Sequence, residues 1–140
     1  MATPPRSGAV HRNIHVTQIL SYRLPPAGVV SILHRISGAV LFLLLPFVIW
    51  LFDTSVSSEV SYETFTSAFI AGMGFLPGWF VKLVALALIW AYLHHFIAGV
   101  RHLWMDMTHS VSKAQGQVSA WITLGASAGL TLALAVKLFI

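Results

Sequence analysis

Three apolar stretches, each long enough to cross a bilayer, dominate this sequence. They cover about residues 29–52, 79–104 and 118–140. A helix rises about 1.5 Å per residue, so about 20 apolar residues span the hydrocarbon core of a membrane. The sequence therefore predicts an all-α integral membrane protein with three transmembrane helices.

The composition agrees with this fold class. Of the 140 residues, 57% are apolar and 9% are charged, whereas about a quarter of the residues in an average soluble domain are charged. The net charge is +4, but the eight Lys and Arg residues are scattered singly, without a basic run or aromatic platform that would follow a phosphate backbone. We therefore expect membrane lipid, and no nucleic acid, as a partner.

Several features that chemistry in water would need are absent from the sequence. It contains no cysteine, no Gly-rich phosphate loop and no polar block large enough to fold as a soluble catalytic domain. Without cysteine, the chain cannot hold an iron–sulfur cluster through thiolates or attach haem covalently at a C-x-x-C-H site. Any haem must be bound non-covalently, and catalysis on a water-soluble substrate must belong to another chain.

The distribution of basic residues predicts the orientation. Residues 1–28 are polar and lack the apolar region of a secretory signal, so we expect this segment to be retained. Arg6, Arg12 and Arg23 precede the first span, whereas residues 53–78 contain three acidic residues and no Lys or Arg. The positive-inside rule predicts a cytoplasmic amino-terminal segment followed by a three-helix membrane anchor domain, 29–140. A bacterial inner-membrane protein is the simplest account, ahead of a mitochondrial one.

The middle span carries ionisable side chains at membrane depth. These are His94, His95, Arg101 and His102, and such residues persist in membranes mainly where they pair, ligate or line a cavity. His95 and His102 share one helix face with Gly99, at i, i+4 and i+7. We expect this glycine to leave a flat notch beside an imidazole, in which a planar macrocycle fits. The imidazole can ligate haem iron; the alternative is a hydrogen bond to a neighbouring helix.

Other residues predict how the helices pack. His94 points about 100° away from its neighbour, and we expect it to hydrogen-bond to another helix. The third span repeats small residues at Gly125, Gly129 and Ala133, which predicts close approach of a helix from this bundle or from a partner. Pro46 predicts a bend in the first span.

An antiparallel arrangement of the first two spans would bring two polar clusters to the same depth in the membrane. The first span starts, and the second ends, on the same side of the membrane, so the side chains around His34 and His102 should meet near the inner interface. Asp106 lies one turn beyond His102. We expect it to pair with Arg35 or Arg101, because a buried charge needs a partner; a place in a proton path is the alternative.

Two sequence blocks carry a family resemblance. The first span contains S-I-L-H-R-I-S-G at residues 31–38, and the second contains H-F-I-A-G-V-R-H-L-W-M-D at residues 95–106. Together they closely resemble the patterns S-I-L-H-R-x-[ST]-G and H-x-x-x-G-x-R-H with a following acid. These patterns belong to the cytochrome b large membrane-anchor subunits of succinate dehydrogenase, respiratory complex II. The three-span layout extends the resemblance over most of the chain, and residues before Arg23 match least.

The resemblance implies roles for five side chains. His95 would be one axial ligand of a b-type haem iron, with the opposite ligand supplied by a small membrane-anchor partner. Ser31 and Arg35 would belong to the ubiquinone site, His34 and Arg35 would contact the haem propionates, and His102 would belong to the haem environment. The residue types suit these roles, because a hydroxyl donates to a quinone carbonyl and a guanidinium stabilises developing negative charge and binds carboxylates.

The same resemblance implies a membrane-anchor subunit of succinate:ubiquinone oxidoreductase. FAD and iron–sulfur clusters would lie only in the flavoprotein and iron–sulfur partner subunits, where succinate is oxidised, and this chain would supply no catalytic residue for that step. Three alternatives stay open. They are the anchor of a quinol:fumarate reductase, a haem-free structural anchor, and a self-contained b cytochrome in which His34 supplies the second ligand to His95.

Overall fold

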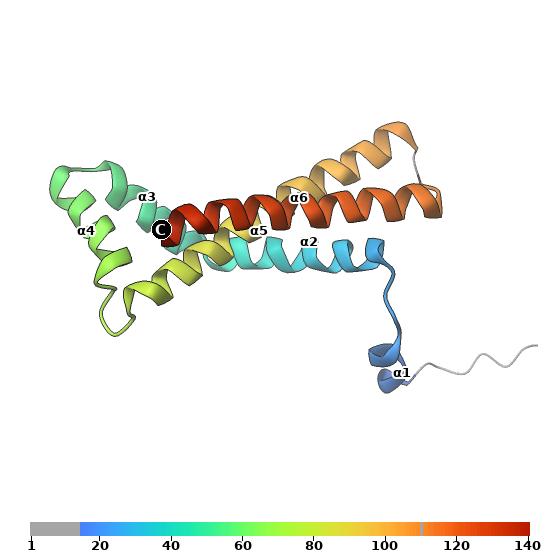
Figure 1. Cartoon of the computed structure of the whole chain (residues 1–140), viewed down its shortest axis with the longest axis horizontal. Coiled ribbons are helices and arrows are strands. Elements are labelled where there is room, and N and C mark those ends of the chain that lie inside the picture. Colours follow the sequence, from blue (N-terminus) through green and yellow to red (C-terminus); the bar gives the residue numbers. More distant parts are fainter. Residues whose placement is uncertain (1–14, 110) are drawn as a thin grey trace, which may run out of the picture.

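The computed structural model describes residues 15–109 and 111–140, and these residues form helices with no strand. The helices, shown in Figure 1, are α1 (Val16–Ser21), α2 (Pro26–Leu43), α3 (Leu45–Val56), α4 (Glu59–Ile70), α5 (Gly78–Thr108) and α6 (Lys113–Phe139). Among them, α2, α5 and α6 are long and apolar enough to cross a membrane. The all-α class with three transmembrane helices is therefore confirmed, while the side on which the amino terminus lies stays a prediction. Arg6 and Arg12, used for that prediction, fall outside the described residues.

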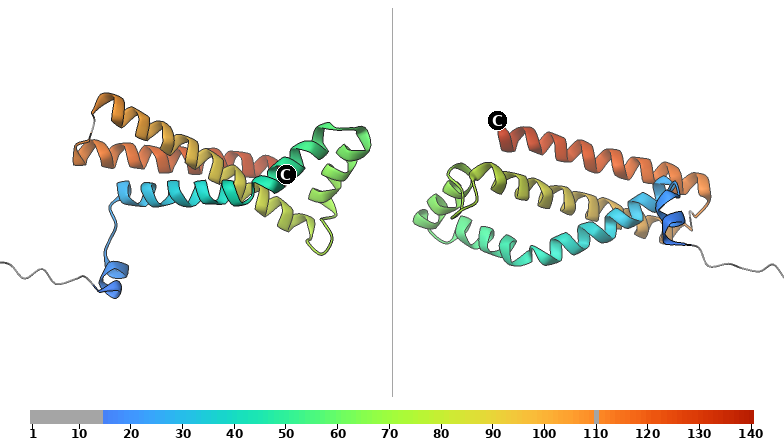
Figure 2. Two further views of the ribbon diagram at one scale, coloured as in Figure 1. Left: turned by 180° about the vertical axis from the view of Figure 1, so that it is seen from behind. Right: turned by 90° about the horizontal axis from the view of Figure 1, so that it is seen from below.

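The three long helices form an antiparallel bundle with α5 in contact with both α2 and α6. The start of α2, the end of α5 and the start of α6 lie at one end of the bundle, and α3 and α4 lie at the other (Figures 1 and 2). The centre is built from small side chains: Val30, Ala98 and Ala120 are buried, and Ala27 and Leu124 pack against them. Because these side chains are small, the helix backbones can approach closely.

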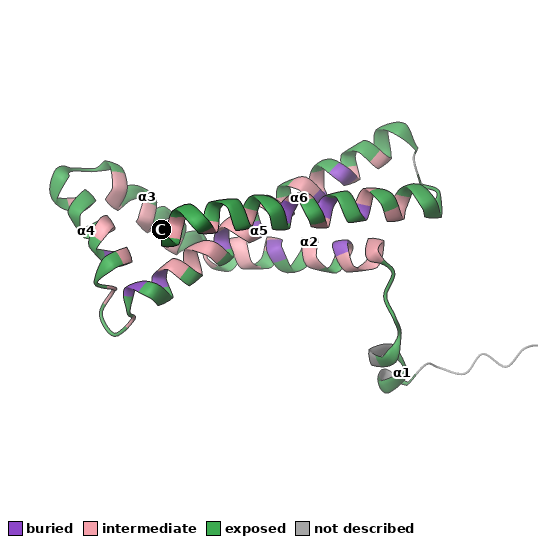
Figure 3. Cartoon of the chain, viewed as in Figure 1, coloured by how far each residue is buried: buried purple, intermediate pink, exposed green. Residues whose placement is uncertain are grey.

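Burial follows the lines along which the helices touch. Figure 3 shows buried residues on the facing sides of α2, α5 and α6 and exposed residues on their outer sides. Many of these exposed residues are large and apolar, for example Phe42, Phe96 and Trp121. Such an apolar exterior is expected of a protein whose outer surface meets lipid or partner helices.

The first predicted span is interrupted between two helices. The predicted span 29–52 is divided at Leu44, where α2 ends and α3 begins. Pro46 has no backbone N–H, so the helical hydrogen bond to the carbonyl of Phe42 cannot form. The amide of Leu44 still donates to the carbonyl of Val40 at 3.0 Å, which keeps the break local. The predicted bend is confirmed.

Part of the segment between the first two spans is helical. The helix α4 begins after Ser58, whose Oγ accepts from the amide of Ser61 at 3.1 Å, while Ser61 Oγ accepts from the amide of Ser58 at 2.8 Å. This reciprocal arrangement satisfies backbone donors that a helix start leaves free. The path from α4 into α5 needs a glycine, because a Cβ on Gly78 would lie 2.6 Å from the carbonyl oxygen of Ile70.

The small-residue repeat of α6 does not pack inside this bundle. Gly125, Gly129 and Ala133 are exposed, and a Cβ built on either glycine would meet nothing within 4 Å. Of the two predicted alternatives, close approach of a helix from the same bundle is therefore wrong. Close approach of a helix from a partner stays a prediction. A different face of α6, with buried Thr123 and Ser127, is turned inward instead.

His94 joins α5 to α6 in the interior of the bundle. Its side chain is fully buried, Nδ1 lies 3.1 Å from Ser127 Oγ, and its ring stacks on Trp90 with 5.5 Å between ring centroids. The backbone of Val30 in α2 lies near the ring, but Nε2 has no hydrogen bond of acceptable geometry within the described residues. The predicted interhelical hydrogen bond of His94 is confirmed.

This hydrogen bond should couple the stabilities of two variants. We expect His94→Ala and Ser127→Ala each to lower the free energy of unfolding, and a double-mutant cycle to give a coupling energy of about 0.5–1.5 kcal/mol. The measurement is reversible denaturation of the purified protein in mixed detergent micelles. Ser55→Ala is the matched control, because Ser55 Oγ donates to the carbonyl of Phe52 within its own helix. Additive losses for His94→Ala and Ser127→Ala would contradict the direct bond.

Candidate functional site

The two sequence blocks meet between α2 and α5, where three imidazole rings gather. The rings of His34 and His95 are stacked, with 4.2 Å between centroids and 24° between planes. The ring centroid of His102 lies 5.3 Å from the ring centroid of His34. The structure thus confirms that the polar side chains of the first span and those of the middle span lie at one level.

The backbone of α2 orients His95. Its Nδ1 lies 3.0 Å from the carbonyl oxygen of His34. Ser37 Oγ donates to the same carbonyl at 2.9 Å and lies 3.4 Å from Nδ1. Since a carbonyl oxygen only accepts, Nδ1 must carry the proton, and the neutral ring then has its lone pair on Nε2. Such a bond from the second ring nitrogen is how proteins commonly orient an imidazole that binds a metal.

A glycine of α2 makes room for this ring. A Cβ on Gly38 would lie 2.9 Å from Cε1 and 3.2 Å from Nδ1 of His95. A Cβ on Gly99 would meet only His34 Nε2, at 3.8 Å. The position is otherwise open, and the notch for a planar macrocycle stays a prediction. Helical spacing shows which residues share a face of α5, but the residue opposite His95 comes from another helix. Gly38 is the final glycine of the S-I-L-H-R-I-S-G block, and this glycine was the signal in the sequence that pointed to the contact.

Ser31 and Arg35 form an accessible polar pair one turn apart on α2. Arg35 Nη2 donates to Ser31 Oγ at 3.4 Å. Arg35 is exposed and Ser31 is half-buried, so none of the helices α1 to α6 covers the guanidinium. The pair flanks His34 in sequence and leaves a hydroxyl and a cation available to a ligand or a partner.

Arg101 and Asp106 do not form the predicted ion pair. Arg101 is 8% exposed and turns toward α6, where Nε donates to Ser119 Oγ at 2.9 Å and Nη2 donates to the carbonyl of Gly116 at 3.1 Å. Asp106 is exposed, and no salt bridge joins it to Arg101 or Arg35 in the described part of the chain. The expected pairing is wrong because Asp106 lies about 140° further round the helix than Arg101.

The three imidazoles do not form a metal site by themselves. Within residues 15–109 and 111–140, no group of three or more His, Cys, Asp or Glu side chains is arranged to hold a metal ion. His34 and His95 are in direct ring contact, so a porphyrin has no room between them in this arrangement.

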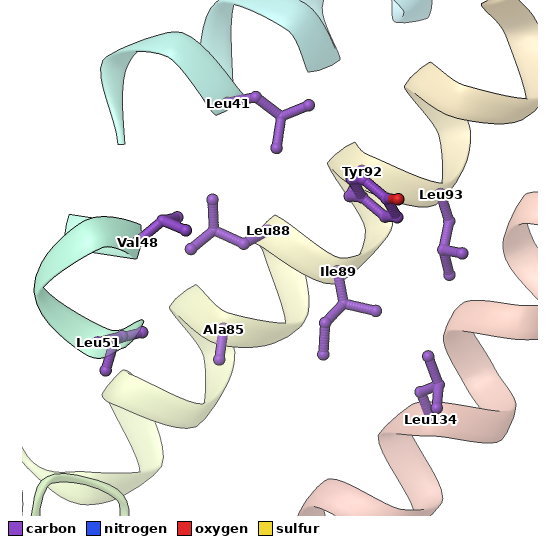
Figure 4. A pocket seen from close by; sticks show the side chains of 9 residues that line it. All are labelled: Leu41, Val48, Leu51, Ala85, Leu88, Ile89, Tyr92, Leu93 and Leu134. Carbon is purple, nitrogen blue, oxygen red and sulfur yellow. The ribbon is translucent and has the colours of Figure 1, made fainter. Parts of the chain in front are cut away.

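An apolar groove of about 460 Å³ lies beyond the histidines, near the break between α2 and α3. Figure 4 shows its lining side chains pointing into a common space; they are Leu41, Val48, Leu51, Ala85, Leu88, Ile89, Tyr92, Leu93 and Leu134. The hydroxyl of Tyr92 is the only polar side-chain group among them. The groove suits hydrocarbon, and it offers no group for acid–base or redox chemistry.

Comparison with known proteins agrees with the two sequence blocks and the three spans. Residues 11–134 match the family described as the succinate dehydrogenase/fumarate reductase transmembrane subunit. The chain is 34% identical over 103 residues to the succinate dehydrogenase cytochrome b556 subunit of Coxiella burnetii, which covers 74% of this chain and 78% of that protein. It is 26% identical over 119 residues to the subunit of the same name from Paracoccus denitrificans, covering 85% and 86% of the two chains. For the Rickettsia felis subunit the identity is 27% over 113 residues, covering 81% and 82%. The matched residues include α2, α5 and most of α6, and the chain belongs to the family of cytochrome b membrane-anchor subunits of succinate dehydrogenase.

Proposed function

We propose that this chain anchors a succinate:ubiquinone oxidoreductase in a bacterial inner membrane and holds haem b together with a small anchor partner. The observation that carries the proposal is the hydrogen bond from Nδ1 of His95 to the carbonyl of His34. This bond holds the ring in place and leaves the Nε2 lone pair for iron. The names of the relatives, which describe cytochrome b556 subunits, support haem as the group bound.

The residues around His95 fit a haem bound from one side. His95 would supply one axial nitrogen, Arg35 and His34 would bind the propionates, and His102 would belong to the haem environment. A guanidinium suits a propionate because its N–H groups pair with both oxygens of a carboxylate. When bound, haem supplies a centre that accepts and returns one electron. The direct contact between His34 and His95 favours a second axial ligand from the partner over one from His34.

Ser31 and Arg35 are the proposed contacts for ubiquinone. The hydroxyl of Ser31 can donate to a quinone carbonyl, and the guanidinium of Arg35 stabilises the negative charge that develops as the quinone is reduced. Their hydrogen bond at 3.4 Å is long, so both groups can turn to a ligand at small cost. FAD and the iron–sulfur clusters belong to the flavoprotein and iron–sulfur partners, which would carry out succinate oxidation.

Removal of the His95 imidazole should remove the haem ligand of this chain. We expect His95→Ala to lower haem content per complex by about tenfold or more, or to abolish bis-histidine coordination. The measurement is a reduced-minus-oxidised optical spectrum of the complex purified in mild detergent. His109→Ala is the control, because His109 is exposed at the end of α5. A bis-histidine spectrum like that of the wild type in His95→Ala would refute the assignment.

A methyl group on Gly38 should disturb the same ligand without removing it. In Gly38→Ala the His95 ring must shift, since a Cβ would lie 2.9 Å from Cε1. We expect a changed haem midpoint potential or lower haem retention. Gly116→Ala is the matched control, because a Cβ there meets nothing within 4 Å and Gly116 lies outside the small-residue repeat of α6. Identical potentials and haem contents in the two variants would show that Gly38 does not position the ligand.

Loss of the Arg35 guanidinium should impair quinone reduction selectively. We expect Arg35→Ala to lower succinate:quinone reductase activity by about 10–100-fold, because a hydrogen bond to a charged group contributes about 1.5–3 kcal/mol. Succinate oxidation by an artificial dye should stay near that of the wild type. Arg23→Ala is the control, since Arg23 is exposed and precedes α2. Equal losses of both activities in Arg35→Ala would indicate failed assembly and contradict a direct role.

A further inference from the structure

The proposed function assigns no role to Arg101, a buried cationic residue at one end of the bundle. Arg101 lies on the face of α5 that also carries buried His94 and Ala98, away from His95. Its guanidinium donates to Ser119 Oγ and to the carbonyl of Gly116, and these two bonds leave further N–H donors free. No acidic side chain forms a salt bridge with it among the described residues. Burial of an uncompensated charge is costly, so an anionic ligand is expected nearby.

The space next to Arg101 is a pocket of about 300 Å³ between the segment before α2, the end of α5 and the start of α6. Lys113 also lines this pocket, so two cationic side chains face one volume. The amino-terminal end of α6 lies beside them and carries a partial positive charge from its backbone dipoles. Without an acidic group in the lining, the pocket is suited to a phosphate or another compact anion.

The position of the pocket favours a lipid over a free anion. Its walls come from the start of α2, the end of α5 and the start of α6, which places it at the height of lipid headgroups. Exposed Trp104 lies near this end of the bundle, as is typical of the membrane interface. Basic pockets between transmembrane helices commonly bind anionic headgroups at such sites.

A second groove adjoins the cationic pocket and has room for the acyl chain of a lipid. It has a volume of about 410 Å³ and shares Met105 with the cationic pocket. Its other lining residues include Trp104, Val118 and Ile122, which offer an apolar path along α6 toward the membrane interior. We propose that Arg101 and Lys113 bind the phosphate of an anionic phospholipid whose acyl chain lies in this groove. The inference goes beyond the proposed function and needs neither haem nor quinone.

Lipid retention by the whole complex tests the proposal. The purified complex is exchanged into micelles containing phosphatidylglycerol or phosphatidylcholine, and bound lipid is counted by native mass spectrometry. We expect phosphatidylglycerol to be retained, with retention lowered about fivefold in Lys113→Gln and further in Arg101→Gln, in line with the contribution of one basic residue at an anionic membrane surface. Lys137→Gln, at the opposite end of α6, is the matched control and should retain lipid like the wild type.

Several outcomes would overturn the inference. Equal retention of phosphatidylglycerol in Lys113→Gln and the wild type would do so, and this variant decides the matter if Arg101→Gln does not assemble, because Lys113 is exposed. Equal retention of phosphatidylcholine would show that the cations do not select the lipid. Displacement of phosphatidylglycerol by millimolar inorganic phosphate would assign the site to the free anion. A carbodiimide cross-link between Lys113 and a carboxylate of another subunit would assign it to a protein partner.

Discussion

The hydrogen bond between Nδ1 of His95 and the backbone carbonyl of His34 joins α5 to α2 at the level of both sequence blocks. It depends on close packing of the two helices, because the ring must reach a main-chain atom. Gly38 permits that approach, and Ser37 adds a second polar contact to the same carbonyl. The same bond fixes which ring nitrogen keeps its lone pair. Helix packing and the proposed haem ligation therefore rest on one interaction.

Neighbouring histidines on α5 have different surroundings because successive residues of a helix point about 100° apart. His94 points into the interior and bonds to Ser127 of α6, where it stabilises the bundle. His95 turns toward α2 and the imidazoles of His34 and His102. Arg101 follows the face of His94 and contacts α6, so one helix presents a structural face and a face available to a cofactor. The two faces can be altered separately by mutation.

The sequence predicted much of the fold and part of the candidate site. The lengths of the apolar stretches indicated three membrane-crossing helices, and Pro46 indicated the break that the structure places at Leu44. The spacing of Ser31 and Arg35 predicted their shared face. The Asp106 ion pair was wrong, because predicting it required knowledge of what lies opposite a helix face. The small residues of α6 predicted close approach of a helix from this bundle or from a partner. They face outward here, so only the partner alternative stays a prediction.

What the sequence determined by itself is the membrane environment, the helical class and the sets of residues that share a face. Apolar length and the periodicity of a helix are local properties, so they can be read along the chain. Only the tertiary structure decided that Gly38 lies against His95, that Arg101 turns to Ser119, and that the small-residue repeat stays uncovered. These contacts depend on how each helix is rotated against its neighbours. That rotation is set by the packing of all three helices together.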